Sequence, residues 1–118
     1  MLPDVIAKVC AIPSDFRRND ATIRSLAEAS GYEPARDAVT VETLQTHLKA
    51  HPDQVEAWLA YSEDKRVESG WYLETRPARG FVLGYYQSGK GMGRQEHFPD
   101  AARACAEFIK KEMDSLLP

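Results

Sequence analysis

The sequence predicts an α+β domain: N-terminal helices, a small antiparallel sheet of two to three strands over about residues 69–98, and a long C-terminal helix. Two observations predict this order. Apolar residues recur at three- and four-residue steps in the first half of the chain and after Pro99, as they do on helices. Between these parts, aromatic and apolar residues alternate as they do on strands. Helices followed by strands are typical of the α+β class.

Length and composition favour one domain over residues 1–118, because 43% hydrophobic and 28% charged residues are ordinary for a globular chain. No stretch approaches the ~20 apolar residues of a membrane span. Asp4 and Lys8 interrupt the apolar N-terminus, so we expect no signal peptide and a cytoplasmic location. Cys10 and Cys105 fall on apolar helical stripes, where buried reduced thiols are expected, with a disulfide or a reactive thiol as the alternative.

The first helices are predicted from apolar spacing and from residues that start or end helices. A helix from Leu2 to Val9 is expected to close at Pro13, with a polar loop over residues 14–19. Asp20 is expected to cap a second helix, and Gly31 to end it. Residues 32–39 are expected to form a connection.

Two further helices precede the strands. Thr40 is expected to cap the first of them, in which Val41, Leu44 and Leu48 face inward. Pro52 suits the first position of the second, because its missing N–H is not needed there. The predicted buried side of this helix comprises Val55, Trp58, Leu59 and Ser62.

Residues 70–76 and 81–86 read as two strands joined by a turn at residues 77–80. Residues 94–98 could supply a third strand. Residues 87–93 hold three glycines and are expected to form a flexible, exposed loop. After Pro99 and Asp100, a helix is predicted from an apolar stripe made by Ala102, Cys105, Ala106, Ile109, Met113 and Leu116.

No motif predicts catalysis, a cofactor or a metal site. Gly84, Gly89 and Lys90 match part of a phosphate-binding P-loop, but Gly91 stands where serine or threonine should hold magnesium. His47 and His51 have a spacing that suits two metal ligands, yet no third ligand is evident. We therefore expect no enzyme activity, although small-ligand or phosphate binding by the glycine-rich loop remains an alternative.

A second alternative is a winged-helix-like DNA-binding protein. Residues 22–31 resemble the first half of a helix-turn-helix, and the following hairpin could act as the wing. However, the next helix begins at Val41, which makes the turn too long, and Lys49 is its only Lys or Arg. The net charge of −3 also argues against nucleic acid as a partner.

The strongest binding signal is a local concentration of positive charge and tyrosine. Residues 76–94 contain four basic residues and no acidic one, which leaves the rest of the chain at a net charge of −7. Such a hairpin suits an anionic patch on a protein partner. The predicted partner-binding residues are Tyr72, Arg76, Arg79, Tyr85, Tyr86, Lys90 and Arg94.

Several short runs also resemble a family of proteins. They are residues 58–66, residues 69–72, residues 82–85, Phe98 with Asp100, and residues 104–109. Over about residues 51–110 the chain resembles small bacterial proteins of uncharacterised function, some of which look like immunity proteins of polymorphic toxin systems. The resemblance implies a non-catalytic protein that neutralises a cognate toxin by binding it. The aromatic residues could alternatively form a homodimer face.

Overall fold

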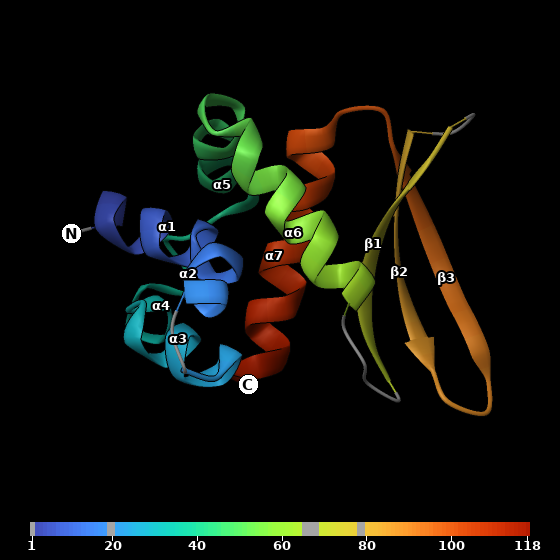
Figure 1. Cartoon of the computed structure of the whole chain (residues 1–118), viewed down its shortest axis with the longest axis horizontal. Helices are drawn as coiled ribbons and strands as arrows, with labels where there is room; N and C mark the ends of the chain where they lie inside the picture. Colours follow the sequence, from blue (N-terminus) through green and yellow to red (C-terminus); the bar gives the residue numbers. More distant parts are fainter. Residues whose placement is uncertain (1, 19–20, 65–68, 78–79) are drawn as a thin grey trace.

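The protein is an α+β fold in which helices and a sheet stand side by side (Figure 1). The computed structural model describes residues 2–18, 21–64, 69–77 and 80–118. Helices α6 and α7 lie against the sheet, and the other helices lie beyond them. This arrangement confirms the fold class predicted from the sequence. The helices are α1 (Leu2–Cys10), α2 (Ile12–Arg18), α3 (Ile23–Ala29), α4 (Tyr32–Ala35), α5 (Val41–Ala50), α6 (Pro52–Asp64) and α7 (Ala101–Leu116).

The region around Pro13 differs from the prediction, because Pro13 opens α2 instead of closing α1. The prediction of a loop over residues 14–19 is therefore wrong for residues 14–18, which are helical. Proline is tolerated in the first turn of a helix, where its missing N–H has no intrahelical partner. Backbone bonds from Ala11 to Ala7 (3.1 Å) and from Asp15 to Ala11 (2.9 Å) carry the chain from one helix into the next.

Helix α3 is capped by Thr22, whose side chain accepts a hydrogen bond from the N–H of Ser25. The expected cap, Asp20, lies outside the described residues. Gly31 ends this part of the chain as predicted, with a left-handed φ of 86° that glycine adopts without steric cost. The next residues are not merely a connection, because they form α4 and place Tyr32 in the core with 0% exposure.

Helices α5 and α6 begin as the sequence predicts. Thr40 and Thr43 form a reciprocal capping box at the start of α5. Pro52 is the first residue of α6, and it directly follows His51, the C-terminal cap of α5. Val55, Trp58 and Ser62 are buried on α6, whereas Leu59 is half-buried.

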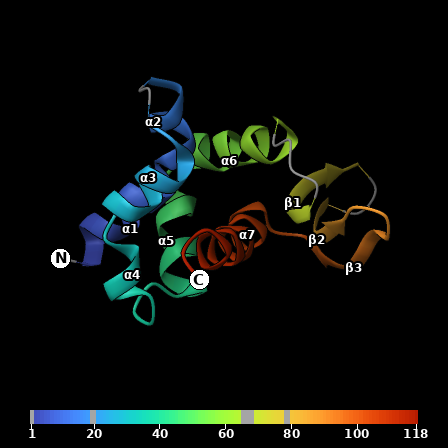
Figure 2. The same cartoon turned by 90° about the horizontal axis from the view of Figure 1, so that it is seen from below.

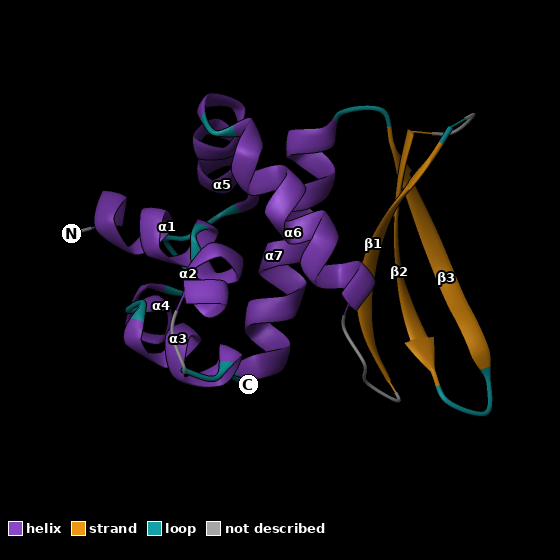
Figure 3. Cartoon of the chain, viewed as in Figure 1, coloured by secondary structure: helices purple, strands orange, loops and turns teal. Residues whose placement is uncertain are grey.

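The sheet comprises β1 (Ser69–Arg76), β2 (Gly80–Gln87) and β3 (Gly91–Phe98), in that order within the described part of the chain. Both pairs are antiparallel, and the register places Leu73 opposite Leu83. The glycine-rich segment is mostly strand, which corrects the expected loop: residues 88–90 form a tight turn and β3 starts at Gly91. Figure 3 shows this short connection in teal at the end of the β2–β3 hairpin.

Helix α7 is the central element of the core. Figure 2 shows it end-on, between the N-terminal helices and the sheet. It contacts α3, α5, α6 and all three strands. Its predicted stripe is buried from Ala102 to Met113. Trp58 of α6 packs edge-on against Phe108 of α7, with ring centroids 6.0 Å apart, and both side chains are fully buried.

Candidate binding surfaces

The three strands divide their side chains between two faces of the sheet. The face that carries Leu73 and Leu83 packs against the helices and belongs to the core. In the described part of the chain no helix covers the other face, as Figures 1 and 2 both show. We call this the outer face. By strand alternation and register it presents Tyr72, Glu74, Arg76, Val82, Gly84, Tyr86, Gln95 and His97.

Tyr72 is held in place on the outer face by its neighbours on two strands. Its side chain lies across Gly84, the residue opposite on β2. Its hydroxyl then accepts a 2.9 Å hydrogen bond from Nε2 of Gln95 on β3. A Cβ atom on Gly84 would lie 2.3 Å from this hydroxyl oxygen. The absence of a side chain at residue 84 therefore creates the space that Tyr72 occupies.

Arg76 also lies on the outer face, but its charge is partly neutralised. Its guanidinium forms a 2.6 Å salt bridge with Glu74, two residues earlier on β1, and both side chains are partly exposed. The charge count over residues 76–94 started after Glu74, so it omitted this carboxylate. In the register Val82, with 0% exposure, lies between Glu74 and His97. We therefore count Arg76 as a weaker source of positive potential than its sequence context suggested.

Tyr85 and Tyr86 lie on opposite faces of the sheet. Tyr86 is 40% exposed on the outer face. Tyr85 packs edge-on against Trp71, with ring centroids 5.1 Å apart, on the helix side of the sheet. Nζ of Lys111 on α7 lies 4.8 Å from the centroid of Trp71. The seven predicted residues thus do not form one surface, because Tyr85 belongs to this aromatic cluster on the opposite side.

Two predicted basic residues lie in or beside the β2–β3 turn. Lys90 is exposed within the turn, where its N–H donates to the carbonyl of Gln87 at 3.0 Å. Arg94 is exposed on β3. The predicted Arg79 lies outside the described residues. We call Lys90 and Arg94, together with Tyr86, the hairpin tip.

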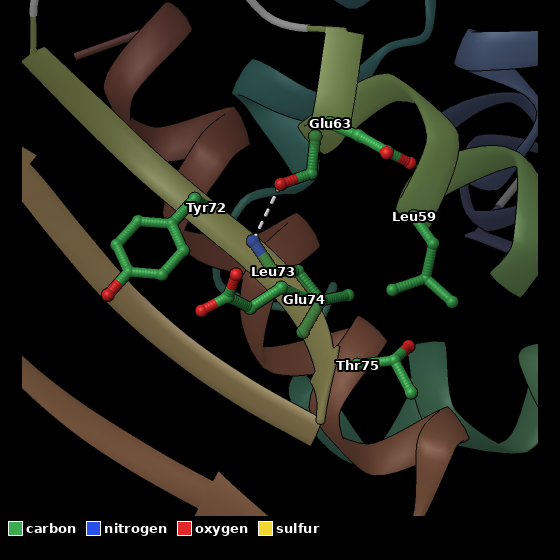
Figure 4. Close-up of a pocket in the computed structure, with 7 residues that line it drawn as sticks. Leu59, Glu63, Tyr72, Leu73, Glu74 and Thr75 are labelled. Atoms are coloured by element: carbon green, nitrogen blue, oxygen red, sulfur yellow. Dashed lines mark hydrogen bonds between the residues drawn. The ribbon is translucent and has the colours of Figure 1, made fainter. Parts of the chain in front are cut away.

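Sequence reasoning missed a hollow between α6 and the edge strand β1 (Figure 4). Its volume is about 450 Å³, and its walls include Leu59 and Glu63 of α6 and Thr75 of β1. Ser62 also lines it, and its Oγ accepts a 2.7 Å hydrogen bond from the N–H of Leu73. Ser62 was predicted to face inward, but the sequence carries no signal that β1 would be an edge strand.

The histidines and cysteines that the sequence offered as possible ligands or reactive groups pack against neighbouring residues. The rings of His47 and His51 stack with centroids 4.1 Å apart, and within the described residues no group of three or more potential ligands could hold a metal ion. Cys10 and Cys105 are buried free thiols. Burial raises the pKa of Cys10 to about 12, which disfavours the reactive thiolate.

The geometry also bears on the two alternatives. The glycine-rich segment is a hairpin turn followed by a strand, whereas a P-loop leads into a helix. Helix α4 separates α3 from α5, so these two helices are not joined by the short turn of a helix-turn-helix. Within the described residues, no helix has the length and apolar character needed to cross a membrane.

No protein-family model matches the chain, and no curated protein or solved structure shows significant similarity to it.

Proposed function

We propose that the protein is a non-catalytic protein-binding module that uses the outer face of its sheet and the hairpin tip. The observation that carries this proposal is the position of Tyr72. A tyrosine fixed by two neighbouring strands loses little conformational freedom on binding, and aromatic side chains dominate many protein interfaces. Its face is uncovered in the described part of the chain.

Because the hairpin tip is positively charged, we expect it to contact an acidic patch on the partner. Lys90 and Arg94 are exposed, and neither forms an ion pair among the described residues. Complementary charges of this kind steer association and set its orientation. The resemblance to immunity proteins suggests a cognate toxin as the partner, and that identity is part of the proposal.

The test is a pull-down from a lysate of the source cells with the tagged protein and a Lys90→Glu/Arg94→Glu variant. One stoichiometric partner should bind the unaltered protein and be lost with the variant. A Lys8→Glu/Arg18→Glu variant changes the net charge by the same amount on exposed residues of α1 and α2, so it should retain the partner. Equal retention by both variants would remove the hairpin tip from consideration.

A further inference from the structure

The hollow beside β1 continues along α6. The two elements lie close together at the C-terminal end of α6 and diverge towards its N-terminal end (Figure 1). A second hollow, of about 330 Å³, shares Leu59 with the first and extends to Val55, Phe81 and Ala101. Together they form a groove along one side of α6, in which β1 lines the first hollow and Phe81 of β2 and Ala101 of α7 line the second. We call it the α6–β1 groove.

The backbone of β1 presents hydrogen-bonding groups to this groove. The N–H of Leu73 points away from β2, because it bonds to Ser62 on α6. In an antiparallel strand the outward-pointing residues alternate with the paired ones. The carbonyl of Leu73 and the N–H and carbonyl of Thr75 therefore also point away from β2. No hydrogen bond to the N–H of Thr75 occurs within the described residues, and Thr75 is exposed.

The two edges of the sheet are protected to different extents. On β3 the pairing with β2 is interrupted by a bulge opposite Tyr85, and charged residues such as Arg94 and Glu96 lie along the strand. Bulges and charges are common devices against unwanted strand pairing. By contrast, all eight residues of β1 pair with β2 in unbroken register. Helix α6 protects this edge at Leu73, where Ser62 accepts from the N–H, so an extended chain could continue the sheet in regular register from Thr75 onward.

The walls of the groove indicate the chemistry of such a chain. Glu56 and Glu63 are exposed on the α6 wall, and neither forms an ion pair in the part of the chain that the structure describes. Lys49 is the one basic residue among those that line the two hollows in the described structure. Leu59, which lines both hollows, and Phe81, which lines the second, are half-buried. This combination complements a segment that alternates basic and apolar side chains.

We infer that the α6–β1 groove binds an extended, basic segment of another protein, which adds to the sheet as a further strand beside β1. Main-chain hydrogen bonds to the N–H and carbonyl of Thr75 would supply affinity, since Ser62 already accepts from the N–H of Leu73, and the carboxylates of α6 would select positive charge. This inference differs from the proposed function in the charge that it selects and in its use of the edge of β1, although Tyr72 borders the first hollow as well.

The test uses a fluorescent peptide of about eight residues that alternates lysine and valine, a length that covers one strand of this sheet. Its anisotropy should rise with the unaltered protein, whereas a peptide with glutamate in place of lysine should not bind. Thr75→Pro removes the outward N–H at an edge position where proline is tolerated, and should weaken binding about tenfold or more. Thr75→Val, which keeps the N–H, should restore most of the binding that Thr75→Pro loses.

Two further measurements apply even if Thr75→Pro fails to fold. The Glu56→Lys/Glu63→Lys variant should lose the lysine peptide, and hydrogen exchange at the Thr75 amide should slow when the peptide is added to the unaltered protein. Equal binding of both peptides, or an unchanged exchange rate at Thr75, would overturn the inference. Concentration-dependent dimerisation without peptide binding would also overturn it, because a second copy of this chain would then occupy the edge.

Discussion

The side chain of Tyr72 occupies the space that a side chain at Gly84 would fill, since a Cβ there would lie 2.3 Å from the tyrosine hydroxyl oxygen. One strand thus supplies an aromatic ring, and the next supplies the gap that receives it. This pair of residues sets the shape of the outer face, and it gives a direct way to alter that face while leaving the core untouched.

Gly84→Ala should displace Tyr72 from Gln95 and abolish partner binding, while changing the free energy of unfolding by about 1 kcal/mol or less, because the displaced atoms end a flexible side chain. In a Tyr72→Ala background the same substitution should instead stabilise the protein by about 0.5–1 kcal/mol, since alanine loses less backbone entropy than glycine. Chemical denaturation of the four proteins checks this. Equal destabilisation in both backgrounds would contradict the contact.

Ser62→Ala should lower the free energy of unfolding by about 1–2 kcal/mol, because it leaves the buried N–H of Leu73 without its partner. The change should also speed hydrogen exchange at Leu73, where β1 meets α6. Ser25→Ala is the matched control, since that hydroxyl bonds to the Thr22 carbonyl at an exposed site and should change stability by about 0.5 kcal/mol or less. Similar losses in both variants would argue against a special role for Ser62.

Alkaline conditions should destabilise the protein through Tyr32 and Tyr61. Burial and nearby carboxylates (Asp114 beside Tyr32, Glu112 beside Tyr61) raise the pKa of both phenols above the ordinary value of about 10. The folded state therefore keeps protons that the unfolded state releases, so stability is lost as pH rises above the unfolded value. Melting temperatures measured from neutral to strongly alkaline pH should fall less steeply for Tyr32→Phe/Tyr61→Phe. Parallel curves would contradict this account.

Mild acid should destabilise the protein through His47. Desolvation lowers the pKa of this imidazole, and its Nε2 bonds to Gln54 Oε1 at 2.9 Å while the His51 ring stacks on it. The unfolded state therefore takes up a proton first as pH falls through about 6.5, and stability declines from there downward. His47→Gln should reduce this slope in urea titrations at several pH values. An unchanged slope in His47→Gln would contradict this account.

Features of the fold that depend on neighbouring residues were predicted well from the sequence. The cap at Thr40, the helix start at Pro52 and the stripe on α7 are local, so a short window of sequence contains their cause. Pro13 was misread because proline both follows one helix and starts another, and a single sequence does not separate the two roles.

The candidate surfaces depend on tertiary structure and were predicted less well. Strand alternation alone places Tyr85 and Tyr86 on opposite faces, so grouping them in one surface was avoidable. The pairing of Arg76 with Glu74 also followed from alternation, because residues two apart share a face. The position of β1 at an edge depends on which strand is central and on the path of α6. Neither can be predicted from a short window of sequence.

The central position of α7 has a consequence for biosynthesis. The ribosome makes this helix after every element that it contacts, so the nascent chain must carry Trp58 and the inner side of the sheet without their main packing partner. Those surfaces stay exposed to chaperones and proteases until residues 101–116 leave the exit tunnel. Completion of the fold is therefore coupled to release of the C-terminal helix, and ribosome-bound chains that stop before Ala101 should remain sensitive to protease.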